Sequence, residues 1–496
     1  MTRRYGNYLF LCRQRSYCSQ LASIPVVGSS GFLSSYRDAY KFILNAPTLV
    51  QRGYDQYPEG VFHVAHLLYW QFVVCDHKLI GNSEVASAPE DVLSFHEATR
   101  KLGSLYIMAG GSLWADDISS CQTVVTSLSR NLHRCFPDVR DEIVCAFDDV
   151  MQLQGSEWKT LTVLPAMMAG VARVSNCLFV GLPLCRNEPY LQNNIDIQFA
   201  VDIVRSANRI TLFPPFLRPI AAGHKFLGKL VEERLTKEKE FGPDWPGKPN
   251  DLISWLLTDA QEGEERTTGL LVKLIMSINM AAIHTSSMTF THALFDLTAH
   301  PEHFLPMREE AEHVVKEEGW TKAALNNMVK IDSFLQESQR LHVISSLLMN
   351  RRVVSKNGFT FSDGTHIPYG AYISIAANYE NPTVFDGFRF ACERAERKVD
   401  DFSEGIFKRH MVSTAVDHLS FGTGKHTCPG RFFAATELKA MLAHLVINYD
   451  VKAEVEGPGV RPADTSFSAR TSPTPPICPD VTGMSDAGSS VIHLRL

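Results

Sequence analysis

The loop between Phe421 and Ala435 contains the side chain most able to do chemistry, Cys428. A helical pattern follows this loop from Thr436, so the cysteine is expected just before a helix. The free backbone N–H groups and the dipole at a helix N-terminus favour a thiolate over a thiol. Glycines at positions 422, 424 and 430 would let a flat group approach the sulfur closely. The segment therefore predicts a thiolate that serves as a ligand.

Two other interpretations of this segment fail on spacing, and one stays open. A phosphate-binding loop needs Ser or Thr after Gly-Lys, but His426 follows Lys425, and Leu419 stands where the first glycine should be. A dinucleotide-binding fingerprint needs a third glycine at the position of Thr427. The alternative that stays open is a buried structural cysteine in an ordinary loop.

The composition limits the class of protein that could position this cysteine. The chain has 496 residues, of which 45% are hydrophobic, so a large buried core is expected and disorder is not. A formal net charge of −6 gives no basic footprint for nucleic acid. The 11 cysteines are odd in number and include no C-x-x-C pair, which argues against a disulfide framework and against zinc fingers.

The pattern of apolar residues predicts a mainly α protein with small β-sheets, of the α+β class. A helical region is expected from about residue 120 to 340, within which Glu232–Gly263 is expected as a helix end followed by a loop. The apolar run Gly269–His300 contains Lys273 and several other polar residues, so a buried central helix is expected in place of a membrane span. Short strands are expected at Phe72–Cys75, Arg352–Val354, Phe359–Phe361, Thr365–Gly370 and Ser490–Arg495.

Two segments place a glutamate and an arginine three residues apart, where both side chains lie on one helix face. Glu97 and Arg100 form one such pair, and Glu337 and Arg340 form the other. Only the second pair lies on a predicted helix upstream of the cysteine loop, and strand signals and then Arg389 follow it. The alternative is that these are solvated charges on a helix surface.

The cysteine segment resembles the haem-ligand signature of the cytochromes P-450, F-x-x-G-x-[HR]-x-C-x-G-x-x-x-A. Every defined position is met, by Phe421, Gly424, His426, Cys428, Gly430 and Ala434. The resemblance implies that Cys428 is the axial ligand of haem b iron, to which a thiolate donates strongly. It also implies that His426 pairs with a haem propionate, and Arg130 and Arg352 are further propionate partners by position.

The resemblance covers most of the chain and assigns the charge pair. It implies one cytochrome P-450 domain over residues 24–496, with a long central helix over the haem, after a segment 1–23 that shows no clear membrane anchor. Glu337, Arg340 and Arg389 resemble the E-x-x-R helix of the family and its meander arginine. They would form a buried charge triad that holds the haem pocket.

The segment Ala281–Thr285 resembles the oxygen-activation segment of the family. Thr285 and His284 would then be catalytic, because they would hydrogen-bond dioxygen and supply protons. A histidine of the core is the alternative for His284, which stands where the family usually has an acid. The substrate pocket would include residues of this helix and of the turn after Arg340, namely Ala281, Ala282, Ser286, Ser345, Ser346 and Leu347.

The resemblance implies a haem-thiolate monooxygenase that oxidises a lipophilic small molecule with dioxygen. The similarity to fungal members points to a terpenoid or another secondary metabolite. Electrons would come from NADPH through a flavoprotein reductase, at the surface of the endoplasmic reticulum, which this chain would meet by peripheral membrane contact. Two alternatives stay open: a haem-dependent isomerase or peroxide-using relative, and a degenerate haem-binding protein without turnover. The short segment between Gly370 and Phe385 motivates the second.

Overall fold

The computed structural model describes residues 23–29, 31–66, 69–81, 84–101, 123–153, 155–207, 214–260, 266–376, 384–396, 410–416, 418–454, 460–462, 464–467, 470–472 and 491–496. Apart from Ser23, the predicted N-terminal segment 1–23 lies outside these residues.

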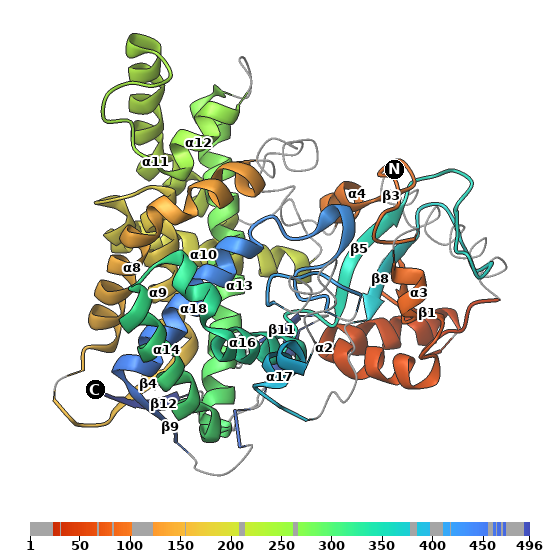
Figure 1. Cartoon of the computed structure of the whole chain (residues 1–496). Coiled ribbons are helices and arrows are strands. Elements are labelled where there is room, and N and C mark those ends of the chain that lie inside the picture. Colours follow the sequence, from red (N-terminus) through yellow and green to blue (C-terminus); the bar gives the residue numbers. More distant parts are fainter. Residues whose placement is uncertain are drawn as a thin grey trace.

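Helices dominate the described part of the chain, as the sequence predicts (Figure 1). The α-helices are α2 (Phe32–Gln56), α3 (His77–Ile80), α4 (Phe95–Lys101), α8 (Ser129–Met151), α9 (Val163–Phe179), α10 (Glu188–Ala207), α11 (Pro214–Phe241), α12 (Leu252–Asp259), α13 (Thr268–Ala299), α14 (Phe304–Glu318), α15 (Lys322–Asn327), α16 (Val329–Leu341), α17 (Arg389–Glu396) and α18 (Arg431–Asn448). Short turns of π- or 3-10 helix are η1 (Val124–Leu128), η2 (Leu184–Arg186), η4 (Pro301–His303) and η5 (Gly424–His426). Helix α12 was not predicted, because its eight residues lie in a stretch whose sequence is typical of a loop.

The strands form small sheets, one of which has five strands in the order β1-β2-β8-β5-β3. Strands β2 and β8 pair in parallel, and the other neighbours in this sheet are antiparallel. The strands are β1 (Val61–Ala65), β2 (Trp70–Val74), β3 (Leu93–Ser94), β4 (Lys159–Thr162), β5 (Leu347–Val353), β6 (Phe359–Thr360), β7 (His366–Ile367), β8 (Tyr372–Ala376), β9 (Asp450–Ala453), β10 (Thr465–Phe467), β11 (Arg470–Ser472) and β12 (Val491–Arg495). Each predicted strand segment overlaps one of these strands.

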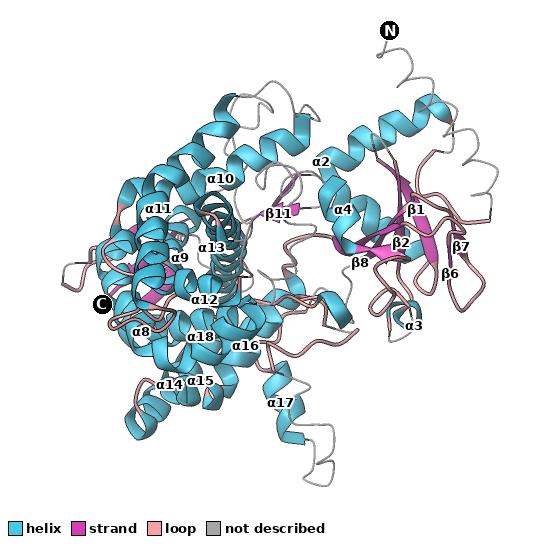
Figure 2. Ribbon diagram, turned by 90° about the horizontal axis from the view of Figure 1, so that it is seen from above, coloured by secondary structure: helices cyan, strands magenta, loops and turns pink. Residues whose placement is uncertain are grey.

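Helix α13 is the centre of the helical body, and Figure 2 shows α9, α10 and α11 gathered on one side of it. The Thr267 hydroxyl caps its N-terminus by accepting a hydrogen bond from Leu270 N, and Pro301 follows its end. A helix that is apolar on all sides must be surrounded by protein or lipid. Most of α13 is buried against α9, α11, α10, α16 and α18, so the prediction of a core helix is confirmed. It is also the one helix among the described residues that is long and apolar enough to cross a membrane.

The five-stranded sheet has an apolar layer on each face. Phe72 and Val74 of β2 belong to a cluster with Ile367 and Leu79, whereas Val73 between them belongs to a cluster with Phe42 of α2. Successive strand residues point to opposite faces, so both sides of β2 can be apolar. The sheet and its helix thus form a second buried unit beside the helical body (Figure 1).

Candidate active site

The Cys428 loop is closed by its own backbone and leads directly into α18. Cys428 N donates to Phe421 O at 2.8 Å, and Arg431 Nη1 donates to Cys428 O at 3.0 Å. Helix α18 begins at Arg431, five residues earlier than the sequence pattern shows. Cys428 therefore lies at the helix N-terminus, where the predicted electrostatic effect on its sulfur acts most strongly.

The electrostatic setting of Cys428 suits a sulfur that binds a cation. Burial raises the pKa of the Cys428 thiol, while backbone N–H groups of Gly430 and Arg431 and the Arg431 charge act in the opposite direction. The protein alone thus provides donors for a thiolate but does not fully stabilise it. A metal ion bound to the sulfur would supply the missing positive charge.

Two positions of this loop require glycine for different structural reasons. Gly424 has φ +74°, and a Cβ there would collide with the carbonyl oxygen of Ala86. That carbonyl also accepts a hydrogen bond from Lys425 N at 3.1 Å, so the loop is fixed to the segment that follows α3 in the sheet unit. A Cβ on Gly430 would meet nothing within 4 Å. Gly430 therefore leaves space near Cys428 that no described residue fills.

His426 belongs to a polar cluster centred on Glu90. The Glu90 carboxylate lies 3.1 Å from His426 Nε2 and 3.1 Å from His96 Nδ1, and it accepts a hydrogen bond from Ser94 Oγ at 2.7 Å. Burial alone would raise the pKa of Glu90, but the hydrogen bonds from both histidines and Ser94 hold it well below its usual range. The ring of His426 also stacks on Phe95, with centroids 4.9 Å apart. No signal in the sequence identifies Glu90 as a partner of His426.

Of the two adjacent arginines on β5, the structure favours Arg351 over the predicted Arg352 as an anion-binding group. Arg352 Nη1 already lies 2.8 Å from the Glu97 carboxylate. Arg351 is 2% exposed, packs over the Phe95 ring at 5.5 Å, and has no carboxylate within ion-pair distance among the described residues. Burial lowers the pKa of Arg351 to about 10, partly offset by Glu90. A buried guanidinium that has no carboxylate partner among the described residues is suited to bind the carboxylate of a ligand.

Arg130, the other predicted propionate partner, lies on α8 and is exposed. Its carbonyl oxygen lies 2.8 Å from His133 Nδ1, and within the described part of the chain its guanidinium forms no ion pair. The structure therefore does not bring Arg130 together with the cluster of Glu90, His426 and Arg351.

The structure joins the three charged residues of the predicted triad. Arg340 donates to the Glu337 carboxylate at 2.7 and 2.9 Å, and Arg389 Nε lies 3.3 Å from both of its oxygens. Both arginines also donate to the carbonyl of Val384, and Asp386 N donates to Glu337 at 3.0 Å. Glu337 is fully buried, so this group ties α16 to the segment that precedes α17.

A second charged group on α16 was missed by the sequence analysis. Asp332, 2% exposed, pairs with Arg394 of α17 at 2.7 Å and with Lys439 of α18 at 3.1 Å. Burial acts to raise the pKa of Asp332, but Lys439, His410 and Arg394 hold it well below the usual value. Because Asp332 connects α16, α17 and α18, it fixes the helix that carries the cysteine loop.

One face of α13 stays accessible within an otherwise buried helix. Ala281 and Thr285 are exposed and Ala282 and Met288 are half-buried, a stripe of residues at the spacing of one helix face. Thr285 Oγ1 donates to Ala281 O at 2.7 Å, so its hydrogen is engaged and its oxygen can act as an acceptor. Helix α13 also packs on α18, which the cysteine loop precedes.

Two residues of α13 with predicted functional roles, Ser286 and His284, do not lie on this accessible face. Ser286 is 2% exposed and faces the carboxyl group of Glu437, so the prediction that it lines the substrate pocket is not supported. A turn of about 100° per residue removes it from the face of Thr285. His284 is 7% exposed, which is the burial that a core histidine would have.

The predicted pocket residues after α16 form the turn that enters β5. Ser345 Oγ donates to the Leu347 carbonyl at 2.9 Å, Ser346 is buried, and Leu347 packs in the apolar cluster with Phe42. These contacts are those of a turn, and a pocket-lining role for the three residues stays a prediction.

Comparison with known proteins decides the family. The sequence model described as Cytochrome P-450 matches residues 81–477. The chain belongs to the cytochrome P-450 family. It is 38% identical over 476 residues to cytochrome P-450 monooxygenase 151 of Postia placenta, with 92% of each chain covered. It is 32% identical over 485 residues to cytochrome P-450 monooxygenase CYP512U6 of Ganoderma lucidum, with 94% of this chain and 92% of the relative covered. It is also 32% identical over 439 residues to cytochrome P-450 monooxygenase AN1598 of Emericella nidulans, covering 83% and 79%.

The residues present fit the haem-thiolate group that the cytochrome P-450 family implies. Cys428 offers a sulfur beside two backbone donors, and Gly430 leaves room next to it. Arg351 is a buried cation without a carboxylate partner among the described residues, as a propionate would require. Ala281 and Thr285 leave an accessible strip of small side chains on the central helix of this cytochrome P-450 monooxygenase.

Proposed function

We propose that this cytochrome P-450 oxidises a lipophilic small molecule, a terpenoid or another secondary metabolite, with dioxygen. The proposal rests chiefly on one observation: Cys428 is held at the N-terminus of α18 by backbone donors, in a chain whose relatives are monooxygenases. The terpenoid class rests on resemblance to fungal members of the family. A lipophilic substrate is supported by the apolar character of α13, which carries the small accessible residues.

When bound, haem supplies the redox chemistry of oxygen activation. The chain's own part is to bind, orient and supply protons. Cys428 would hold the iron, and Arg351 and His426 would hold the propionates. The Thr285 hydroxyl, whose hydrogen is engaged by Ala281 O, can accept a hydrogen bond from water and so keep a proton donor on the accessible face of α13. His284 would relay protons to this point, while its burial supports the alternative of a structural core residue.

The electron supply and the location complete the proposal. Electrons would come from NADPH through a flavoprotein reductase, and the protein would work at the endoplasmic reticulum surface by peripheral membrane contact. Membrane association is typical of fungal relatives of this kind. Co-sedimentation of the full chain with vesicles of phosphatidylcholine would test the membrane contact, and recovery in the supernatant alone would contradict it.

The central test is the spectrum of the reduced carbon-monoxide complex of the expressed, haem-supplied chain. Wild type should show the absorption band typical of thiolate-ligated haem, and Cys428→Ser should lose it. Cys392→Ser, at an exposed cysteine of α17, is the matched control and should keep it. An unchanged band in Cys428→Ser would overturn the assignment.

Turnover with isotopically labelled dioxygen tests the reaction type. With a fungal NADPH-dependent reductase, the product from a terpenoid mixture should carry one labelled oxygen atom. A product without label would indicate the isomerase or peroxide-using alternative. Normal haem uptake without NADPH consumption for any substrate would indicate the degenerate haem-binding alternative.

A further inference from the structure

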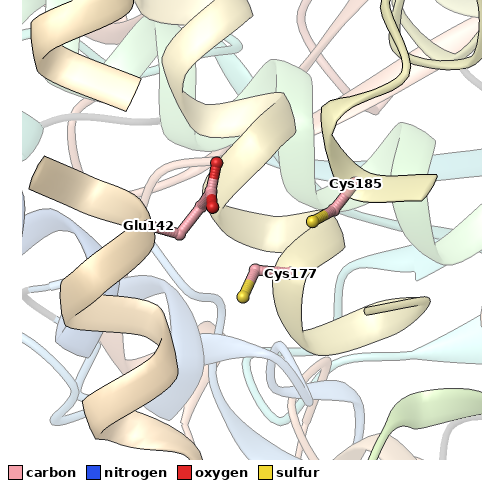
Figure 3. A group of neighbouring side chains, drawn as sticks. All are labelled: Glu142, Cys177 and Cys185. Atoms are coloured by element: carbon pink, nitrogen blue, oxygen red, sulfur yellow. The ribbon is translucent and has the colours of Figure 1, made fainter. Parts of the chain in front are cut away.

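Two cysteines outside the haem site lie next to each other between α8, α9 and η2. Cys177 is near the end of α9, and Cys185 is in η2. Their sulfur atoms and a carboxylate oxygen of Glu142 all lie within 4.8 Å of one another, and Figure 3 shows this group. Cys185 is fully buried, whereas Cys177 is half-buried and within reach of solvent.

The turn that follows α9 brings the two sulfurs together. Val180 N and Gly181 N both donate to Asn176 O, which ends the helix, and Cys185 N donates to Gly181 O at 3.0 Å. Gly181 has φ +70°, a conformation that favours glycine. The chain thus reverses directly after α9, and Cys185 returns to the side of Cys177.

Glu142 is not available as a metal ligand in this group. Its Oε1 lies 2.7 Å from Arg173 Nη2, and its Oε2 lies 2.7 Å from Arg186 Nη2. A metal ion would have to displace two guanidinium groups from a carboxylate that is 2% exposed. Arg173 also pairs with Asp149 at 2.6 Å, so two arginines and two carboxylates already balance one another without a metal cation.

The two thiols differ in what they contact. The Cys177 thiol donates to the Asp138 carbonyl oxygen at 3.6 Å and also contacts Cys185. The contact with Cys177 lowers the pKa of Cys185, with help from Arg186 and Arg173 and against burial and the Glu142 charge. The same contact raises the pKa of Cys177, together with burial. Of the two sulfurs, Cys185 is therefore the one that loses its proton more readily.

We propose that Cys177 and Cys185 form a redox-active dithiol, which hydrogen peroxide converts to a disulfide. Cys177 gives its proton to the Cys185 thiolate as its sulfur attacks one peroxide oxygen. An S–O bond forms, the O–O bond breaks, and the departing hydroxide takes that proton from Cys185 to become water. The Cys185 thiolate then attacks the Cys177 sulfur, so that the S–S bond forms and the S–O bond breaks, and the departing hydroxide takes a proton from solvent to leave as a second water. The two thiols together lose two electrons, and one peroxide becomes two waters.

The arrangement explains why this pair and not another would react. Attack needs a sulfur that the oxidant can reach, which Cys177 provides, and a base and second sulfur beside it, both of which Cys185 provides. The S–S bond of about 2.05 Å requires side-chain rotation from the present separation, and a short turn outside regular helix joins the two residues. The proposal does not depend on haem.

The test uses the full-length holoprotein, first reduced, then freed of reductant, then treated with a small excess of hydrogen peroxide. Mass spectrometry of the intact chain should show a loss of two hydrogens. After alkylation and digestion, it should find a pair of peptides joined between Cys177 and Cys185. Cys177→Ser and Cys185→Ser should each lose this cross-link completely. Cys392→Ser, at an exposed thiol elsewhere, should keep it.

Several outcomes would overturn the proposal. One is oxygen added to Cys177 in the wild type without any cross-link. Another is a cross-link that survives in Cys177→Ser. A third is stoichiometric binding of added Zn²⁺ that protects both thiols, because that would make the group a metal centre. Since the wild-type peptide map alone gives the first result, the test does not depend on how well the serine variants fold.

Discussion

Ser175 on α9 donates a hydrogen bond of 2.7 Å to the carboxyl group of Glu437 on α18. Glu437 is fully buried, and Ser286 of α13 also faces its carboxyl group. Burial raises the pKa of Glu437 to about 8, although the two hydroxyl groups act in the opposite direction. The helix that follows the cysteine loop is therefore joined to the central helix through a carboxylic acid that is mostly neutral at pH 7.

This relationship predicts a pH dependence of stability. Because the pKa of Glu437 is about 8 in the folded state and 4.5 for an ordinary glutamate, the folded state holds a proton that the unfolded state releases. The free energy of unfolding should thus fall by up to about 1.4 kcal/mol per pH unit from this group between these two values. Glu437→Gln keeps the shape and stays neutral, so its melting temperature relative to wild type should rise from pH 5 to pH 8.

Glu309→Gln, at an exposed glutamate of α14, is the control and should show no such trend. A constant difference between Glu437→Gln and wild type across this range would show that Glu437 is ionised in the folded protein. Thermal unfolding followed by circular dichroism in buffers of equal ionic strength is a sufficient measurement.

The sequence predicts the elements of this fold better than their contacts. The run Gly269–His300 predicts α13 because a long apolar segment with interspersed polar residues and a following proline is typical of a buried helix. The pairs that fix the site join segments far apart in the chain, such as His426 with Glu90 and Lys439 with Asp332. No local pattern encodes such a pair, so only the folded structure shows it.

The adjacent arginines show the same limit at the site. Successive residues of a strand face opposite sides, so one of Arg351 and Arg352 had to face Glu97 and the other the cluster at His426. Which one does so depends on the register of β5, which shifts between Leu348 and Arg351. A single sequence does not reveal that irregularity.

We expect Arg351→Ala to retain haem several-fold less well than wild type, because it would leave a propionate without its buried cation. Arg351→Lys should recover part of the loss. Arg352→Ala removes only a partly exposed pair with Glu97, worth about 0–1 kcal/mol, and should retain haem normally. Transfer of haem to an apo-haemoprotein acceptor measures retention, and equal transfer rates for wild type and Arg351→Ala would rule out this role.

Gly424→Ala and Gly430→Ala separate a protein contact from a cofactor contact. Gly424→Ala should destabilise the fold by about 2–4 kcal/mol, because its Cβ would collide with the Ala86 carbonyl at a positive φ. The methyl group of Gly430→Ala would meet no atom of the described residues within 4 Å, so the unfolding transition of its haem-free form should match wild type while its haem uptake falls. Denaturant titration of haem-free protein, beside haem titration, distinguishes the two, and a stable Gly424→Ala protein would contradict the expected clash.

The two E-x-x-R segments offer a matched test of burial. Glu337→Gln leaves Arg340 and Arg389 facing a neutral amide in a buried site, and should cost about 3–5 kcal/mol. Glu97→Gln weakens a partly exposed pair with Arg352 and should cost about 0–1 kcal/mol. Urea unfolding of both variants measures the contrast. Similar losses in the two proteins would mean that the Glu337 group is worth no more than a surface ion pair.

Thr285 and His284 differ in exposure, and this difference predicts different phenotypes. Thr285→Ala removes the hydroxyl from the accessible face of α13, so haem binding should persist while reducing equivalents from NADPH go to hydrogen peroxide, with product per NADPH lower by about tenfold or more. Thr285→Ser keeps the hydroxyl and should stay coupled. If His284 is a core residue, as its burial indicates, His284→Gln should lower the melting temperature and leave coupling unchanged. If it relays protons, the coupling of His284→Gln should fall with that of Thr285→Ala, and its kinetic solvent isotope effect should rise. Unchanged coupling in Thr285→Ala would remove Thr285 from the proposed mechanism.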